Sequence, residues 1–315
     1  MSPVDRLERF ERDGSQQWAL VRGERAESPV LLLVQGGPGL PMIHEADALE
    51  RALSLQEHFR VVYWDQRGTG KSRLRPCTPL SLAALRDDVV AMTHALCERL
   101  EVPSVHVAGF SLGASLALLA CEEDASRVAS LTCVGPDVNL LQSERHAMAF
   151  ALSEAQRLGR TRILRALRAL GEPPHAEARR FSERIKHVAD LGGIHRGKTY
   201  ADLLRHNLSG LWRSPHYSLR EMVAALRAIG TLQERLLPEL QGFDLGSRPL
   251  EPGVPVAIFQ GRLDAAAPPQ LAVQLAERLQ APLVWFDQSA HSPHFEEPSR
   301  FREVLLRFAL EVSPR

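Results

Sequence analysis

The residues from 105 to 120 constrain the fold of this chain more than any other stretch. They form a short apolar strand, the pattern Gly-x-Ser-x-Gly and an apolar helix, in that order. This order is typical of a nucleophile elbow, a sharp turn that lifts the serine hydroxyl clear of a sheet. We expect Gly109 and Gly113 where a Cβ atom would collide with the crossing backbone. Ser111 would then stand at a helix N-terminus, which favours developing negative charge.

Composition and charge are those of an ordinary globular protein. The 315 residues, 44% of them hydrophobic, suffice for one large α/β core with an insertion. The 38 Lys and Arg residues balance 38 Asp and Glu residues, so we expect neither nucleic acid nor a membrane as partner. We find no signal peptide and no apolar run of membrane length. The scattered Cys77, Cys97, Cys121 and Cys133 favour a cytoplasmic protein without metal or cofactor.

Apolar runs and helical spacings alternate along both ends of the chain. Two strands joined by a turn at Asp13–Gly14 are followed, beside the elbow strand, by buried strands at 29–34, 60–64, 128–134, 254–259 and 283–286. Helical spacing predicts helices at 81–100, 269–279 and 298–312. Strands that alternate with helices indicate a mostly parallel, doubly wound sheet. The predicted fold class is therefore α/β.

The pattern changes between residues 136 and 252. Strand-like runs disappear there, and Arg- and Leu-rich helical segments follow one another. We expect this segment to form an α-helical cap inserted into a core made of residues 1–135 and 253–315. Such a cap would exclude long chains from a site beneath it and admit a small molecule or a short peptide.

Three predicted strand-end loops carry a nucleophile, an acid and a base. A serine hydroxyl needs a base to remove its proton, and the base needs a group that holds it in one tautomer. The carboxyl ends of parallel strands meet at one edge of a sheet, which would bring together Ser111, Asp264 and His291. Asp287 is a rival acid and His294 a rival base. Asp287 lies only four residues before His291, a poor position from which to orient the ring.

Two backbone N–H groups would stabilise the oxyanion of an acyl-transfer reaction. One belongs to Leu112, directly after the nucleophile. The other is expected in the Gly36–Gly37 pair, where Gly37 is preferred because it precedes Pro38 and the loop turns inward there. We expect Gly36, which has no side chain, and Phe110, beside the nucleophile, to contact the substrate.

A second loop invites a different interpretation. Gly70-Lys71-Ser72 ends like a phosphate-binding P-loop, but that motif needs glycine five residues before Gly70, where this chain has Asp65. We therefore interpret the segment as a strand-end loop. In it, Asp65 and Arg67 would make local hydrogen bonds near the rim of the site.

These motifs resemble those of the α/β-hydrolase superfamily and, within it, its proline iminopeptidase-like branch. The resemblance rests on residues 36–39 (GGPG), 65–72 (DQRGTGKS), 109–113 (GFSLG), 261–264 (GRLD) and 290–298 (AHSPHFEEP). It implies a helical cap and a triad of Ser111, Asp264 and His291, because the family's histidine precedes the Ser-Pro of its loop. It also implies the release of an N-terminal residue, proline or another, from small peptides or amides through an acyl-enzyme.

The sequence departs from the pattern of that branch in three places. Gln35 replaces the histidine that usually begins the Gly-Gly-Pro-Gly loop, and Phe110 and Leu112 differ from the usual Gly-Gly-Ser-Trp-Gly elbow. The cap shows no clear match to the family's amine-binding carboxylates. An esterase, thioesterase or lactonase is therefore the alternative enzyme, and a non-catalytic receptor the alternative outside enzymes. The carboxylates that the cap offers are Glu144, Glu177, Glu183, Glu221, Glu234 and Glu239.

Overall fold

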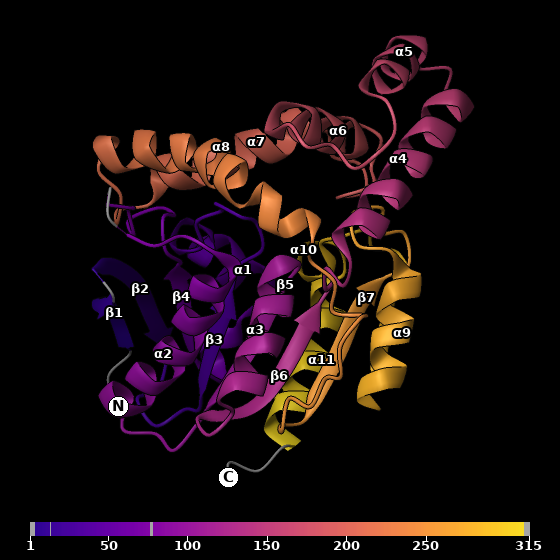
Figure 1. Ribbon diagram of the computed structural model, residues 1–315. Coiled ribbons are helices and arrows are strands. Elements are labelled where there is room, and N and C mark those ends of the chain that lie inside the picture. Colours follow the sequence, from indigo (N-terminus) through magenta and orange to yellow (C-terminus); the bar gives the residue numbers. More distant parts are fainter. Residues whose placement is uncertain (1–3, 13, 76–77, 312–315) are drawn as a thin grey trace.

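An eight-stranded sheet forms the centre of the computed structural model, which describes residues 4–12, 14–75 and 78–311 (Figure 1). The strands are β1 (Val4–Arg12), β2 (Ser15–Gly23), β3 (Val30–Val34), β4 (Arg60–Asp65), β5 (Val105–Phe110), β6 (Val128–Val134), β7 (Val256–Gly261) and β8 (Leu283–Phe286). Their order in the sheet is β1-β2-β4-β3-β5-β6-β7-β8. The pairs β1–β2 and β2–β4 are antiparallel, and all other pairs are parallel. The predicted α/β fold is confirmed.

Helices cover both faces of this sheet. They are α1 (Ala46–Leu53), α2 (Leu82–Leu100), α3 (Leu112–Glu123), α9 (Pro269–Leu279), α10 (Pro293–Glu296) and α11 (Pro298–Glu311), with 3₁₀ turns η1 (Ile43–Glu45) and η2 (Leu55–Glu57). Side chains of α2, α3 and α9 share an apolar cluster with Leu32 and Val34, whereas α1 and α11 share one with Leu31 and Leu33. Successive side chains of a strand point to opposite faces, so β3 is apolar throughout because it is buried on both.

The predicted boundaries agree closely with these elements. β6, β8 and α9 have the predicted bounds, and β7 begins at Val256 rather than at residue 254. The sequence pattern did not predict α1, α10, η1 or η2, which are short and partly polar. Cys77 and Asp13 of the predicted turn lie outside the described residues.

Five helices separate β6 from β7. They are α4 (Leu140–Arg157), α5 (Thr161–Leu170), α6 (Ala178–Asp190), α7 (Tyr200–Arg213) and α8 (Leu219–Gln241). Figure 1 shows them together above the edge of the sheet toward which β6 points. α4, α5 and α6 share a small apolar core of their own, whereas the end of α8 packs on α2 and α3. Among the described helices, none is both long and apolar enough to cross a membrane.

The turn between β5 and α3 depends on close backbone packing. Ser111 has φ 52° and ψ −126°, outside the regions that most residues adopt. A Cβ atom on Gly109 would lie 2.5 Å from Cα of Ala114. One on Gly113 would lie 2.4 Å from the carbonyl oxygens of Val34 and Gln35. The glycines predicted for this turn are therefore required by its packing.

We predict that Gly113→Ala lowers the free energy of unfolding by about 3 kcal/mol, because the added methyl group meets backbone oxygens that side-chain motion cannot displace. Gly230→Ala is the matched control in α8, where a Cβ would have no neighbour within 4 Å. This control should be neutral or slightly stabilising, since alanine favours helix more than glycine does. Urea unfolding followed by circular dichroism measures both. Equal midpoints for Gly113→Ala and wild type would contradict the packing argument.

Candidate active site

Ser111 lies on the wall of a cavity of about 470 Å³. The cavity lies between the loops that follow the strands of the sheet and the helices α4, α6, α7 and α8, all of which contribute lining residues. Gly36, Gly37, Phe110 and His291 also line it, so most of the predicted site residues surround one space. A cavity of this size suits a small organic molecule or a dipeptide.

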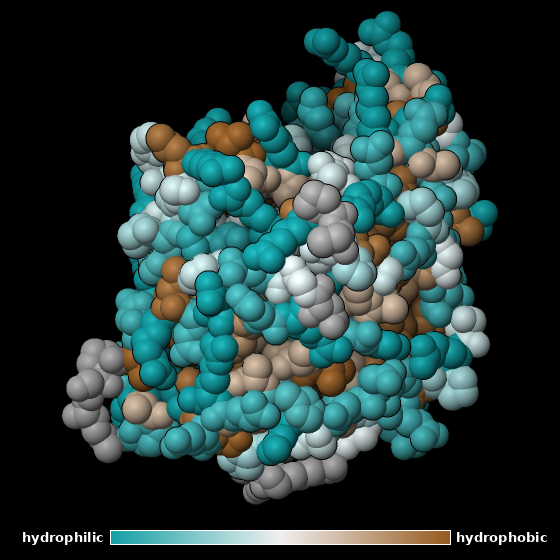
Figure 2. Space-filling view, turned by 60° about the vertical axis from the view of Figure 1, so that its left-hand side comes forward, coloured by the Kyte–Doolittle hydropathy of each residue, from teal (hydrophilic) through white to brown (hydrophobic). Residues whose placement is uncertain are grey.

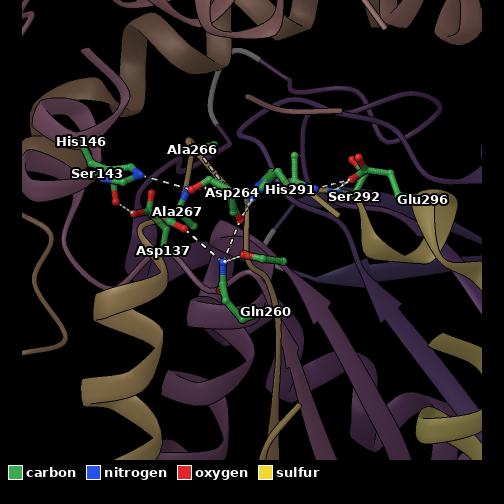
Figure 3. Close-up of polar contacts among 12 residues, drawn as sticks. Asp137, Ser143, His146, Gln260, Asp264, Ala266, Ala267, His291, Ser292 and Glu296 are labelled. Carbon is green, nitrogen blue, oxygen red and sulfur yellow. Dashed lines mark hydrogen bonds and ion pairs between the residues drawn. The ribbon is translucent and has the colours of Figure 1, made fainter. Parts of the chain in front are cut away.

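Asp264 is a buried carboxylate that is hydrogen-bonded by its own loop, by the end of β7 and by the loop of His291 (Figure 3). Its Oδ1 accepts hydrogen bonds from the backbone N–H groups of Ala266 and Ala267, both at 2.8 Å. Its Oδ2 lies 2.7 Å from Nδ1 of His291 and accepts a further bond from Nε2 of Gln260 at 3.1 Å. This arrangement holds the imidazole in one orientation and leaves its Nε2 for another partner.

The pKa of His291 is raised above its usual value of 6.5. Burial alone would lower this pKa, because burial disfavours a charged ring. The Asp264 carboxylate opposes burial through its charge and its hydrogen bond, with smaller contributions from Asp137 and Glu296. The ring is therefore readily protonated, as a base in acyl transfer must be.

The rival residues take other positions. Asp287 forms an exposed ion pair with Arg262. His294 lies among aromatic rings, with its ring centroid 4.8 Å from that of Phe110 and 5.9 Å from that of Phe301. Burial there lowers the pKa of His294 to about 3, so it stays neutral. The geometry therefore favours Asp264 and His291 over both rivals.

Ser111 and His291 face the same cavity without a hydrogen bond between them. Among the described residues, the Ser111 hydroxyl has no hydrogen-bond partner, and such catalytic bonds often form only as substrate binds. Gly135 leaves room for the ring, since a Cβ there would lie 3.1 Å from Cε1 and Nδ1 of His291. Two backbone hydrogen bonds attach the loops of His291 and Asp264 to the segment between α6 and α7. The N–H of His291 donates to the carbonyl of Ile194, and the N–H of Ala265 donates to the carbonyl of Gly193, both at 3.0 Å.

Gln35 supports the predicted oxyanion loop. Its side-chain Oε1 accepts a hydrogen bond from the N–H of Gly36 at 2.9 Å, and its carbonyl accepts one from Nε2 of Gln66 at 2.7 Å. Within the described part of the chain, the N–H groups of Gly37 and Leu112 have no acceptor. Gly36 is thus already engaged, whereas Gly37 and Leu112 keep free donors.

The Asp65–Ser72 loop is a structural support. Asp65 is fully buried and accepts hydrogen bonds from the N–H of Lys71 at 2.8 Å and the hydroxyl of Tyr217 at 2.7 Å. Arg67 forms a two-pronged ion pair with Asp88, with both bonds at 2.6 Å. The predicted local bonds are present, and Tyr217 links the loop to the start of α8.

Three carboxylates line the cavity, and only one of the six that we considered in the cap is among them. Glu144 lies 2.9 Å from the Arg184 guanidinium, and Glu45 lies 2.8 Å from Nε2 of His206. Asp137 accepts a hydrogen bond from the Ser143 hydroxyl at 2.8 Å and has no ion pair within the described residues. Nor do these residues contain a group of three or more His, Cys, Asp or Glu side chains that could hold a metal ion.

The sequence analysis missed three residues that support or line the site. Gln260 also donates to the carbonyls of Gly261 and Ala267, which fixes its amide beside Asp264. Glu296 accepts hydrogen bonds from the N–H groups on either side of His291, and Asp137 lies near the histidine on the loop after β6. The sequence offered a signal for two of them. Gln260 is a polar residue near the end of a buried strand, and Glu296 is an acid soon after the histidine.

Comparison with known proteins agrees with this geometry. Residues 29–298 match the family described as alpha/beta hydrolase fold. The chain belongs to the α/β-hydrolase family. Its similarity to the proline iminopeptidase-like branch, predicted from the motifs, is confirmed by curated relatives that include a probable aminopeptidase and proline iminopeptidases.

Two curated relatives match this α/β-hydrolase over most of its length. The probable aminopeptidase YbaC of Bacillus subtilis (strain 168) is 28% identical over 309 residues, which cover 94% of this chain and 93% of the relative. The putative carbamate hydrolase RutD of Agrobacterium fabrum (strain C58) is 27% identical over 296 residues, 90% of this chain and 94% of the relative. The crystal structure of a proline iminopeptidase-related protein from Thermus thermophilus has a TM-score of 0.64 at 23% identity and covers 99% of both chains.

We predict that Asp264→Asn lowers the pKa of His291, because burial then acts without the carboxylate that opposes it. At pH 6.5 the wild-type ring should be mostly protonated and the ring in the variant mostly neutral. Asp287→Asn, which alters the rival acid, should leave this pKa unchanged. NMR titration of labelled imidazoles measures it, and the signal is assigned by its loss in His291→Gln. An equal fall in both aspartate variants would argue against the Asp264–His291 pair.

Proposed function

We propose that this protein is a serine hydrolase in which Ser111 is the nucleophile, His291 the base and Asp264 the residue that orients it. The observation that carries the proposal is the 2.7 Å contact between Asp264 and Nδ1 of His291 on the wall of the cavity that Ser111 also lines. The strained backbone of Ser111 supports the same assignment, because strain of this kind is retained where function needs it. The family match and the names of the relatives agree with hydrolysis.

The proposed mechanism passes two protons through one histidine, one in the formation of the acyl-enzyme and one in its hydrolysis. His291 takes the Ser111 proton as the hydroxyl oxygen attacks the substrate carbonyl, then passes this proton to the leaving group. The N–H groups of Gly37 and Leu112 stabilise the oxyanion, each by about 3 kcal/mol. Water then attacks the acyl-enzyme, again with His291 as base, and Ser111 is released.

The first candidate reaction is removal of an N-terminal residue from a small peptide or amide. An aminopeptidase must hold the substrate's ammonium group, which sits one carbon from the scissile carbonyl. Of the three carboxylates in the cavity, Asp137 alone forms no ion pair within the described residues, although its charge interacts at longer range with His291 and Arg184. Burial raises the pKa of Asp137, and a bound ammonium group would lower it again. We therefore assign the amine to Asp137, with α4–α8 acting as the cap that limits substrate length.

The second candidate is hydrolysis of an ester, thioester or lactone without a free amine. It is favoured by Glu144 and Glu45, which the protein neutralises with Arg184 and His206. A cavity with its charges paired internally suits an uncharged acyl group better than an ammonium group. The similarity to a putative carbamate hydrolase also supports an acyl substrate that is not a peptide.

The proposed nucleophile can be tested with a fluorescent fluorophosphonate, which labels activated serines. We expect wild type to be labelled and Ser111→Ala to be unlabelled, because the reagent needs a serine whose proton a base removes. Ser153→Ala, which alters an exposed serine on α4, should be labelled like wild type. Labelling is read from a gel and from the mass of the intact protein. Full labelling of Ser111→Ala would rule out this serine as the nucleophile.

The two candidate reactions can be distinguished by comparing the cleavage of substrates that have a free amine with the cleavage of substrates that lack one. If the first holds, prolyl and alanyl anilides are cleaved, and Asp137→Asn lowers their kcat/KM about 30-fold, the value of one charged hydrogen bond of about 2 kcal/mol. Cleavage of nitrophenyl acetate should fall much less in that variant, since there only the small contribution of Asp137 to the pKa of His291 is lost. Asp287→Asn should affect neither substrate. If only esters were cleaved, the aminopeptidase reaction would be ruled out and hydrolysis of an ester, thioester or lactone would remain.

A further inference from the structure

Exposed hydrophobic residues concentrate on two helices. Of the ten large hydrophobic residues exposed in the described part of the chain, seven lie on α7 and α8. The two most exposed are Trp212 at 72% and Leu219 at 65%. We call these seven residues the α7–α8 face: Tyr200, Leu204, Leu208, Trp212, Leu219, Val223 and Leu226.

Helical spacing aligns the members of the α7–α8 face. The four on α7 are four residues apart, and those on α8 are separated by four and three, so each set lies along one side of its helix. Figure 1 shows α7 and α8 at the upper left, above the sheet. Figure 2 brings that side forward, and hydrophobic residues appear along its upper left edge. An exposed apolar surface of this kind typically marks an interaction site.

The α7–α8 face borders the mouth of the active-site cavity. Tyr200, Leu204 and Leu226 belong to the face and also line the cavity. Residues that are both exposed and cavity-lining lie where the cavity meets solvent. A partner or surface that binds to the α7–α8 face would therefore also lie against the mouth of the cavity.

The segment that carries the face has an excess of positive charge, although α7 and α8 over their whole length hold five arginines and four acids. Residues 198–230 contain five Lys and Arg residues against two acidic ones. Both acids are already engaged, because Asp202 lies 2.7 Å from the Arg205 guanidinium and Glu221 lies 2.9 Å from Nζ of Lys71. Within residues 198–230, the exposed arginines that have no ion pair to a described residue are Arg213, Arg220 and Arg227. The balanced charge of the whole chain conceals this local excess.

We propose that the α7–α8 face docks on an anionic lipid surface and turns the cavity mouth toward it. Tryptophan and leucine that project between arginines are typical of helices that lie in the interface of a bilayer. A second copy of the chain fits less well, since a two-fold interface would bring the unpaired arginines of both copies together. Docking itself does not require the triad. Delivery of an amphiphilic acyl substrate to Ser111 by this route would rest on the proposed function.

The test is sedimentation of the full-length Ser111→Ala protein with vesicles, so that neither turnover nor its failure affects the result. We expect binding to vesicles of phosphatidylcholine mixed with phosphatidylglycerol, and much weaker binding to phosphatidylcholine alone. Trp212→Ser combined with Leu219→Ser should abolish sedimentation. Arg213→Gln and Arg220→Gln should each weaken binding about fivefold at low salt and reduce its salt dependence.

The matched control is Leu310→Ser with Arg307→Gln on α11, where both residues are also exposed. This pair should bind vesicles like the parent, and circular dichroism verifies that each variant is folded. The proposal is overturned if the anionic vesicles do not bind the parent, if both vesicle types bind it equally, or if the control loses binding as well. It is also overturned if sedimentation velocity shows a dimer that Trp212→Ser with Leu219→Ser dissociates, because a second copy then occupies the face.

Discussion

The contact between the start of α3 and the end of β3 determines the geometry of the site. Gly113 approaches the carbonyl oxygens of Val34 and Gln35 so closely that no side chain fits between them. This approach brings Ser111, the proposed nucleophile, and the loop of Gly36 and Gly37 to one side of the sheet. Backbone packing thus limits the distance from Ser111 to the proposed oxyanion donors. Hydrogen bonds made by the side chains of Gln35 and Gln66 support the loop in this position.

A second constraint is the cost of burying Asp264. A buried carboxylate is tolerated only when its oxygens are satisfied, and here two backbone N–H groups and Gln260 supply donors besides His291. The charge is therefore stable enough to raise the pKa of the histidine. The backbone bonds from Ala265 to Gly193 and from His291 to Ile194 join the loops of the acid and the base to the segment between α6 and α7. A movement of the proposed cap would therefore also move Asp264 and His291.

Much of this could be predicted because the relevant signals are local. Buried strands such as β6 are unbroken apolar runs, and Ser111, Asp264 and His291 follow strands whose carboxyl ends share one edge. Asp137 could not be found in this way, and the polar Gln260 near the end of β7 was only a partial signal, since the importance of both depends on what the fold places beside them. The same holds for the α7–α8 face. Helical periodicity identifies an apolar stripe, but only the packing of the whole molecule decides whether it is buried.

The proposed catalytic residues and the cavity wall follow different physical rules. Ser111, His291 and the glycine loop are held by backbone geometry and by a buried acid. The cavity wall instead pairs charges of its own, as Glu144 does with Arg184. An internal pair of this kind leaves no net charge to attract an ion, so apolar contacts must supply most of the binding energy for an uncharged substrate. Asp137 is the exception among the cavity carboxylates, and under our proposal its ionisation state would decide whether the cavity accepts an amine.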